Sequence, residues 1–599
     1  MMSPNYSPSR PPQSTGDELV GIALLAGGAT CVCVWYVAVT RFHMTNQECL
    51  EIFCYFANGF VGLLLLITQL VGRRTRKEAQ WPHPPLCVPA EKDQRVVSEA
   101  HQAGATVLGY NVHGEPWLWP DTVRTRHGII AGGTGAGKST FLKSIIVQDL
   151  GRTFGDRRMP MIIFDGKGDE EFLEDMLPHI TASGRLQDLR VVNPTDPQRS
   201  VKYNPFMASE ELYQEHINFI FQSFGLRKDF FEGHQEAYLY DLARVLHHTG
   251  KVFNARDILI MALDEDVLAE QITLAHKRIS SRTDISVQAR QSFEMSSRML
   301  QRSFKDRDRV EKIQGLLNEL VAFLEDNLSI ISGSYQDNLT PDQVVDEGLI
   351  LWVLLNLNKN RRACEAFGKI MLKNIQLTIG KRYSVPPALR DPNEPYLSVL
   401  FDEIGPFVFP DLPHGLQTAR GAKVMMLFST QAVPQFQKLG QAFADELISA
   451  PATKMIMHGS EENTVQWFMK ASSRVTTKRR TLAVRKTGLI LPNYRETGAG
   501  SESDTRETRA REEHIKNLPV GQMEVLMADP LAGTLHSHLH VRHQPTLRLE
   551  GFRSAIYPQM HVPVDPSAGA NLRFSEENAS RPRRRASGLS LSKFLGRQV

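Results

Sequence analysis

Cysteine is scarce in this chain, with six residues among 599. Four of them fall within the first 54 residues, and the rest of the sequence holds only Cys87 and Cys364. No pair shows the C-x2-C spacing of a zinc site, so a metal module built from cysteine pairs is excluded. A long chain with so few thiols after its first segment suits a reducing cytoplasm.

A marked excess of charge is also missing. The 69 lysines and arginines are nearly balanced by 66 aspartates and glutamates, which leaves a net charge of +3. The chain as a whole therefore gives no electrostatic signal for a polyanionic partner, and any nucleic-acid binding must come from local patches. The C-terminal end is poor in apolar residues and carries Arg581 and the run 583–585. We expect residues 561–599 to be a disordered basic tail.

Long uncharged runs are present near the N-terminus, at residues 19–40 and 52–72. Each can cross a hydrocarbon core of about 30 Å as a helix. A cationic cluster at residues 73–77 follows directly, and flanking cations stay on the cytoplasmic side. We expect a two-helix transmembrane hairpin with both chain ends in the cytoplasm. A cleaved signal peptide fits less well because two acids precede the first run. A buried soluble hairpin is the other alternative.

Residues 132–139 read G-G-T-G-A-G-K-S and match the phosphate-binding pattern G-x-x-x-x-G-K-[ST] at every fixed position. Glycines let backbone N–H groups turn toward a triphosphate, the lysine reaches its β- and γ-phosphates, and the serine hydroxyl ligates Mg²⁺. A strand pattern precedes the loop and a helix pattern follows it, as an anion site at a helix N-terminus requires. An ordinary glycine-rich turn is the alternative. We assign ATP binding to Gly132, Gly133, Thr134, Gly135, Ala136, Gly137, Lys138, Ser139 and Thr140.

A later strand pattern at residues 396–401 ends in Asp402 and Glu403. A phosphate-loop ATPase needs such a pair, with Asp402 in the Mg²⁺ shell beside Ser139 and Glu403 polarising the attacking water. The alternative is that the two acids cap a following helix. Gly405 disfavours this reading because glycine is a poor helix former.

Two further polar residues are candidates for catalysis. Gln431 follows another buried strand pattern, where it would report loss of the γ-phosphate; the alternative is a solvent-facing strand end. Arg420 lies near a helix end before that strand. It would act as an arginine finger on the nucleotide of a neighbouring subunit, or it is an ordinary surface arginine.

Strand patterns alternate with helix patterns around the phosphate loop, which predicts an α/β fold with a parallel sheet between helices. Proline is absent from residues 209 to 333, where helical spacing dominates. We expect an all-α domain there, whose charges form either a solvated face or part of a substrate-contacting surface. The expected order is a cytoplasmic segment (1–18), the transmembrane hairpin (19–72), a linker (73–105), a nucleotide-binding domain in two parts (106–208 and 334–560) around the all-α domain (209–333), and the tail (561–599).

The order of these motifs resembles the type IV secretion coupling proteins of the TraG/TraD kind, in the FtsK–HerA group of ring-forming translocases. Gly166 stands where that family tends to carry proline, which leaves the role of its turn open. The shared features are the loop block from His127, the turn at 164–169, Y-N-P-F at 203–206, the strands ending at Asp402-Glu403 and at Gln431, and N-L-P-V-G-Q at 517–522.

This resemblance implies a RecA-like nucleotide-binding domain and a homohexamer in the bacterial inner membrane that hydrolyses ATP with Mg²⁺ at its subunit interfaces. It implies as partners DNA held without sequence specificity, a relaxase or relaxosome proteins, and components of a secretion channel. Three functions stay open: a DNA-translocating motor, the same motor as a receptor for protein effectors only, and a non-hydrolysing membrane adaptor. An adaptor has no need of a water-activating acid such as Glu403.

Overall fold

The chain divides into two compact units, residues 1–83 and 84–599. The computed structural model describes only parts of the second: residues 86–168, 170–207, 213–224, 232–324, 326–336, 338–358, 361–459, 461–487, 493–547 and 569–575. The expected transmembrane hairpin at 19–72 therefore lies outside the described residues. Among the helices within those ranges, none combines the length and the apolar character needed to cross a bilayer.

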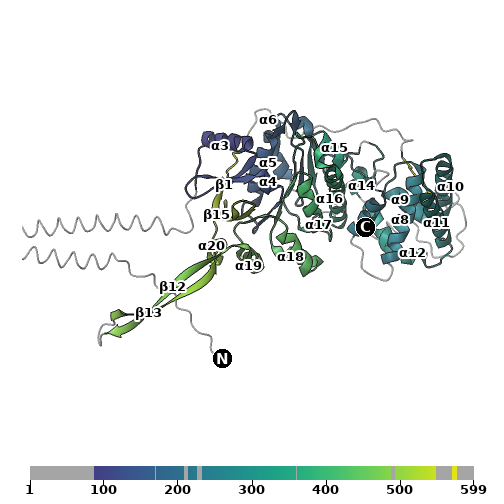
Figure 1. Cartoon of the computed structure of the whole chain (residues 1–599). Helices are drawn as coiled ribbons and strands as arrows, with labels where there is room; N and C mark the ends of the chain where they lie inside the picture. The colour runs from purple at the N-terminus through teal and green to yellow at the C-terminus, as the bar shows by residue number, and fades with distance from the viewer. Residues whose placement is uncertain are drawn as a thin grey trace, which may run out of the picture. The chain divides into compact units, whose positions relative to one another are not determined.

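An eleven-stranded mixed sheet forms the centre of this unit (Figure 1). Seven neighbouring strands are parallel, from β11 to β7 in spatial order, and the remaining four pair antiparallel. The spatial order is β2 (Pro116–Pro120), β1 (Ala105–Tyr110), β15 (Gly533–Val541), β14 (Gln522–Asp529), β11 (Thr453–Ile456), β3 (Gly128–Ala131), β10 (Val424–Thr430), β9 (Leu397–Phe401), β6 (Met161–Asp165), β8 (Ile350–Leu354) and β7 (Leu189–Val192).

The expected α/β fold is confirmed, and the sheet is mixed because four strands at one side pair antiparallel. Strands β1 and β2 form one hairpin, and β14 and β15 form another. Short turns can join only antiparallel neighbours, and each of these pairs is joined by a short connection. The parallel strands instead carry the long helical crossovers that the alternating pattern predicts.

Helices cover both faces of the sheet because alternate residues of each strand point to opposite sides. On β3, Ile129 packs into one core and Ile130 into the other. The core that holds Ile130 is closed by α5 (Lys138–Leu150) and α6 (Glu170–Ala182). The opposite core is closed by α16 (Arg361–Ser384), α17 (Leu412–Gly421) and α18 (Gln441–Ser449). Smaller elements are α3 (Ala90–Gln102), α4 (Asp121–Arg124), β4 (Thr153–Phe154) and β5 (Arg157–Arg158).

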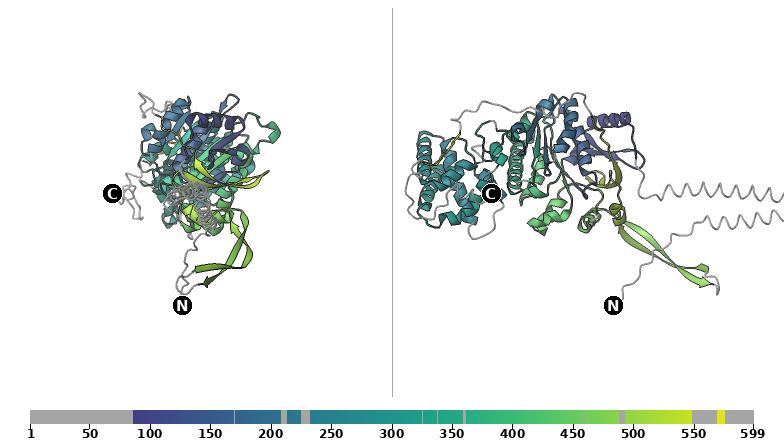
Figure 2. Two further views of the ribbon diagram at one scale, coloured as in Figure 1. Left: turned by 90° about the vertical axis from the view of Figure 1, so that its left-hand side faces the viewer. Right: turned by 180° about the vertical axis from the view of Figure 1, so that it is seen from behind.

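A helical region is inserted between β7 and β8, and its elements share one continuous core with the sheet (Figure 2). Polar side chains begin three of its helices: Asn254 caps α9, Asp264 caps α10 and Ser286 caps α11. The helices are α7 (Tyr213–Ser223), α8 (Glu232–Thr249), α9 (Ala255–Leu263), α10 (Glu265–Ser281), α11 (Val287–Ser303), α12 (Arg309–Lys312), α13 (Gln314–Ala322), α14 (Asp326–Ser332) and α15 (Pro341–Asp346).

A two-stranded ribbon follows α19 (Glu462–Ala471). Its strands, β12 (Arg474–Thr487) and β13 (Asn493–Thr508), pair antiparallel, with a register shift between Leu482 and Val484. The ribbon returns to the body beside its starting point, where the Arg509 N–H donates to the Ser473 carbonyl at 2.9 Å. Helix α20 (Glu512–Lys516) comes next.

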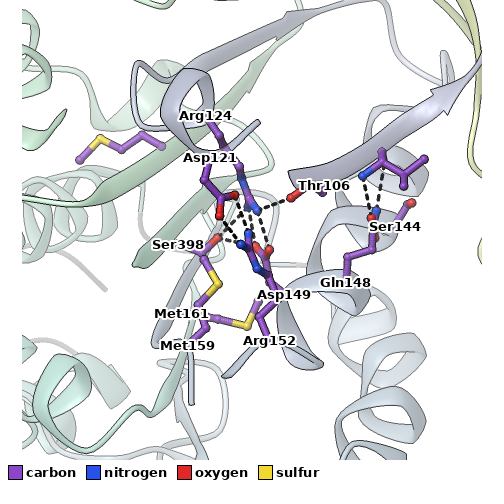
Figure 3. A network of polar contacts seen from close by, with 12 residues as sticks. Thr106, Asp121, Arg124, Ser144, Gln148, Asp149, Arg152, Met159, Met161 and Ser398 are labelled. Atoms are coloured by element: carbon purple, nitrogen blue, oxygen red, sulfur yellow. Dashed lines mark hydrogen bonds and ion pairs between the residues drawn. The ribbon is translucent and has the colours of Figure 1, made fainter. Parts of the chain in front are cut away.

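A buried ion-pair network ties the far end of α5 to the sheet (Figure 3). The guanidinium of Arg124 donates to both carboxylate oxygens of Asp149, at 2.6 and 2.5 Å. Asp149 also accepts from the Ser398 hydroxyl on β9, at 2.7 Å. Both charged side chains are at most 1% exposed. The network therefore fixes the helix that follows the phosphate loop against the strand that leads to Asp402.

The expected disordered tail, residues 561–599, is wrong for one short segment. Residues 569–575 pack against the helical region, where Leu572 is buried and Ala570 hydrogen bonds to Val252. Composition predicts disorder from a low average content of apolar residues, and an average cannot detect a single well-placed leucine. The other residues of that tail lie outside the described part of the chain.

Candidate nucleotide-binding site

The phosphate loop connects β3 to α5 at the carboxyl edge of the parallel strands. Gly135 and Gly137 have φ angles of 78° and 103°, in the left-handed region that favours glycine. Gly132 is required for a different reason, because a Cβ there would lie 3.0 Å from the Cβ of Met457. These three positions explain why the loop needs glycine at those points of the motif.

Neighbouring strand ends hold the backbone of the loop. The Gly132 N–H donates to the Thr430 carbonyl at the end of β10, at 3.2 Å. The Gly133 N–H donates to the His458 carbonyl, which follows β11, at 2.8 Å. A Cβ at Gly137 would lie 3.5 Å from the nitrogen of Gly521, so the 517–522 motif packs over the loop. Motif reading alone assigned no place to His458 or Gly521.

Lys138 is buried at the first position of α5. Its ammonium donates to the carbonyl oxygens of Gly132 and Gly133, at 2.5 and 3.0 Å. Burial lowers the pKa of Lys138, while Glu403 acts in the opposite direction. The ammonium is thus held inside the curve of the loop, next to the backbone that an anion would contact.

The two predicted Mg²⁺ ligands are brought together although 263 positions separate them in the sequence. The Ser139 hydroxyl donates to Oδ1 of Asp402 at 2.9 Å. Lys167 joins them from the turn after β6, with its ammonium 2.5 Å from Oδ2 of Asp402 and 3.2 Å from the Ser139 hydroxyl. Lys167 was quoted in the sequence only as part of a family-like turn, and its place beside Asp402 is new.

Glu403 lies next to this group and is 8% exposed. Burial raises its pKa to about 7, while Lys138 and the Gly405 N–H act against that shift. Among the described residues, no side chain donates a hydrogen bond to either carboxylate oxygen. A Cβ at Gly405 would lie 2.6 Å from Oε1 of Gln435 and 3.3 Å from Oε1 of Glu403, so Gln435 faces the same spot. A buried carboxylate that titrates near neutrality suits a general base.

Gln431 and Arg420 occupy opposite edges of the sheet. Gln431 directly follows β10, whose last residue contacts the phosphate loop, and its side chain is exposed. Arg420 is exposed near the end of α17, before β10 begins. The length of β10, about 20 Å at the usual rise per residue, separates the two. The structure therefore does not bring Arg420 to the loop of its own chain.

The remaining loop residues divide by exposure. Thr134, Gly135 and Thr140 are exposed, and Ala136 is buried. Gly166, which stands in place of the family's proline, packs tightly: a Cβ there would lie 3.0 Å from the ring of Phe407 and 3.1 Å from the Glu403 carbonyl. The departure from the family pattern is thus matched by the local packing of Phe407.

The residues present fit a nucleoside triphosphate with Mg²⁺. The left-handed glycines and the N-terminus of α5 form an anion cradle, and two lysines supply positive charge. Ser139 and Asp402 offer adjacent oxygen ligands. Mg²⁺ usually takes only one or two protein ligands and completes its shell with phosphates and water. The described residues hold no cluster of three His, Cys, Asp or Glu side chains that could bind a metal ion.

Three solved structures illustrate the similarity of this fold to known proteins. The unbound bacterial conjugative coupling protein TrwBdeltaN70 matches with 16% identity and a TM-score of 0.48, over 78% of this chain and 96% of that one. TrwB in complex with ADP and Mg²⁺ matches with 16% identity and a TM-score of 0.46, over 80% of this chain and 98% of that one. VirB4 of Thermoanaerobacter pseudethanolicus matches with 14% identity and a TM-score of 0.46, over 73% and 96%.

No curated protein matches the sequence. Residues 396–526 match the family model described as the "TraM recognition site of TraD and TraG". The matched range begins just before β9 and includes Asp402, Glu403, Gln431 and the turn that packs over the phosphate loop. It therefore includes both the acid pair and the turn that packs over the phosphate loop, and over this segment the chain is similar to TraD and TraG.

Proposed function

We propose that this protein is an ATPase that drives conjugative DNA, with its attached relaxase, toward a type IV secretion channel. One observation carries the enzymatic part of the proposal: the hydrogen bond between Ser139 and Asp402. It joins the phosphate loop to the acid pair, so the two halves of a hydrolytic site meet at one edge of the sheet. A buried Glu403 beside them supplies the base that hydrolysis requires.

Each residue has a distinct part in the proposed reaction. Lys138 leaves the loop carbonyls and contacts the β- and γ-phosphate oxygens, where negative charge develops. Glu403 accepts a proton from the attacking water, and Gln435 and Gln431 border the space in which that water and the γ-phosphate lie. Mg²⁺, when bound with the triphosphate, neutralises charge on the phosphate oxygens. Ser139 and Asp402 would hold it.

The family supplies the proposed partners. The matched segment is named for TraM recognition in TraD and TraG, so we propose a relaxosome protein as a partner of residues 396–526. DNA without sequence preference, channel components and further copies of the chain complete the set, with a homohexamer as the proposed assembly. Arg420 in such a ring would reach the nucleotide of a neighbour. The proposed cellular location is the bacterial inner membrane, with residues 19–72 as the membrane anchor and the bulk of the chain in the cytoplasm.

Exposed cations on the helical region are candidates for DNA contact. Lys277 on α10 and Arg302 on α11 are exposed. Arg278, by contrast, is half buried and packs against Gly250, where a Cβ would collide with its guanidinium group. We propose Lys277 and Arg302 as phosphate contacts, and Arg278 as a structural residue.

The test is ATP hydrolysis by the full chain in detergent micelles, measured without DNA and with unrelated single- and double-stranded oligonucleotides. A translocase must hold every sequence equally, so contacts go to phosphates and binding falls steeply with salt. We expect DNA of any sequence to stimulate hydrolysis at about 50 mM salt and to lose most of this effect at about 200 mM.

Two alternative outcomes separate the competing functions. Hydrolysis that DNA leaves unchanged at every salt concentration would favour a receptor for protein effectors. A folded chain that binds ATP and does not hydrolyse it would favour the adaptor. The test variant carries both Lys277→Gln and Arg302→Gln and should show less stimulation by DNA. The matched control is Arg95→Gln, which should leave the stimulation unchanged, because Arg95 is an exposed arginine paired with Glu99 outside the helical region.

A further inference from the structure

Residues 569–575, with the sequence G-A-N-L-R-F-S, lie against the helical region as an extended segment. The segment begins at a parallel bridge between Gly569 and Val252, and the Ala570 N–H donates to the Val252 carbonyl at 2.8 Å. It ends at Ser575, beside the first turn of α10. Residues 569–575 therefore cross the N-terminal ends of α9 and α10.

Two buried carboxylates receive the backbone of this segment. The Leu572 N–H donates to Oδ1 of Asp257 at 2.8 Å, and the Ser575 N–H donates to Oδ2 of Asp264 at 2.8 Å. The Ser575 hydroxyl adds a contact to Asp264 at 3.1 Å. Both aspartates are 0% exposed. Buried carboxylates are costly unless hydrogen-bonded, so these amides complete the solvation of two charges that the helices themselves leave partly open.

The same two aspartates also organise the helices. Asp257 closes a capping box with Asn254 at the start of α9, and Asp264 accepts the N–H groups of Asp266 and Val267 at the start of α10. In each aspartate, one carboxylate oxygen accepts hydrogen bonds from the start of its helix, and the other accepts an N–H group of residues 569–575. The two aspartates therefore accept main-chain N–H groups that lie three residues apart in the segment.

The residue types in the segment match the positions they occupy. Gly569 lies so close to the Tyr335 ring that any Cβ would collide with it. Asn571 has a φ of 43°, a left-handed conformation that asparagine tolerates better than most residues. Leu572 is 7% exposed and belongs to the main core. Arg573 and Phe574, which face outward, are exposed. The pattern Gly-x-Asn-Leu-x-x-Ser is thus specified by contacts.

We propose that Asp257, Asp264, Tyr335 and the Val252 carbonyl form a docking site for an extended peptide, and that residues 569–575 occupy it as a reversible latch. Ordering seven residues costs conformational entropy comparable to the gain from one buried leucine and a few hydrogen bonds. The latch therefore opens without unfolding the helices. Its covalent link to the body raises its effective concentration at the site, so it outcompetes the same segment supplied by another molecule.

A labelled synthetic peptide of residues 566–578 tests the proposal. Fluorescence anisotropy is measured with the full chain in detergent micelles, as wild type and as the Leu572→Asp variant, whose own segment no longer packs. We expect the peptide to bind Leu572→Asp at least tenfold more tightly than wild type, where the latch competes. Arg573→Asp changes charge at an exposed position of the same segment and should behave as wild type. A peptide carrying the Leu572→Asp change should not bind.

Hydrogen exchange supplies an independent readout. The amides of Leu572 and Ser575 should be protected in wild type and unprotected in Leu572→Asp, while α9 and α10 stay protected in both. A chain that ends at residue 568 replaces Leu572→Asp if that variant loses protection in α9. Equal peptide binding by wild type and the released forms, or no binding by either released form, would overturn the proposal. Neither result depends on ATP hydrolysis, so the proposed enzymatic function is tested separately.

Discussion

The ammonium group of Lys167 lies 2.5 Å from Oδ2 of Asp402 and so occupies the space between the two proposed Mg²⁺ ligands. Its distance to the Ser139 hydroxyl is 3.2 Å. The lysine comes from the turn after β6, and Gly168 in that turn has a φ of 60° and packs against Asn356. The turn therefore delivers a tethered cation to the place where a divalent cation would bind.

Replacing Lys167 with methionine should let Mg²⁺ bind more readily in the absence of nucleotide. The change removes a positive charge that competes for the same oxygens, and we expect about a tenfold lower half-saturating concentration. Thermal midpoints across a magnesium series at constant ionic strength measure it. Lys143→Met is the matched control, because Lys143 pairs with Asp175 instead. Equal magnesium dependence in Lys167→Met and wild type would refute this role.

Lys138→Ala should reduce ATP turnover by about 10²–10³-fold, the typical loss when one group that stabilises transition-state charge is removed. The fold should persist, because among the described residues the ammonium donates hydrogen bonds to two carbonyls of the loop and to no element outside it. Phosphate release, together with a thermal midpoint for each protein, makes the comparison. Turnover by Lys138→Ala close to that of wild type would show that Lys138 does not take part in hydrolysis.

Glu403→Gln should abolish the pH dependence of turnover. The pKa of Glu403 is raised to about 7 by burial, and a base acts only when deprotonated, so wild-type kcat should rise through pH 7 and then level off. A glutamine cannot take the proton, and the variant should be slow at every pH while nucleotide affinity is kept. A rate profile between pH 5.5 and 9 decides the matter. An identical slope in both proteins would place the base elsewhere.

The same substitution should stabilise the nucleotide-free protein at high pH. The folded pKa of Glu403 is raised from 4.5 to about 7, so its contribution to stability is present below pH 4.5 and is lost as pH rises through 7. Above pH 8, Glu403→Gln should be more stable than wild type by about 3 kcal/mol. Urea denaturation at pH 5 and pH 8.5 measures the difference. A variant that is less stable than wild type at pH 8.5 would contradict the shift.

Asp149→Ala should destabilise the protein by about 3–5 kcal/mol, because it leaves the Arg124 guanidinium buried without its carboxylate. Glu99→Ala is the control, since it breaks an ion pair with Arg95 in which both side chains are well exposed. That change should cost less than about 1 kcal/mol. Urea midpoints of the two variants compare a buried with an exposed pair. Similar losses would show that the Arg124–Asp149 pair contributes little.

Local features were the most predictable from sequence. The strands β3, β9 and β10 lie where short apolar runs end in glycine or in polar residues, because a buried strand and the turn after it leave their pattern in neighbouring positions. The apolar run at 258–263 fits either a strand or a helix when taken alone, and the helical spacing of the residues around it indicates the helix that Asn254 caps.

Long-range features were not predictable. The antiparallel pairing of β14 with β11 depends on which strands meet in space, and no neighbouring residue encodes that choice. Lys167, Gln435 and Gly521 reach the candidate site from three separate segments: the turn after β6, the 3-10 helix Val433–Leu439 and the turn before β14. The packing of residues 569–575 could not be predicted, because it depends on contacts such as the hydrogen bond from Leu572 to Asp257, which lies 315 positions away in the sequence.

The ribbon formed by β12 and β13 has one more consequence. Both of its strands leave the body at a single joint, where Arg474 pairs with Thr508 and Arg509 bonds to Ser473. The entropy of closing the rest of the chain around that joint is therefore independent of the ribbon's length. We therefore expect insertion or loss of paired residues along the ribbon to leave the sheet and the candidate nucleotide site intact.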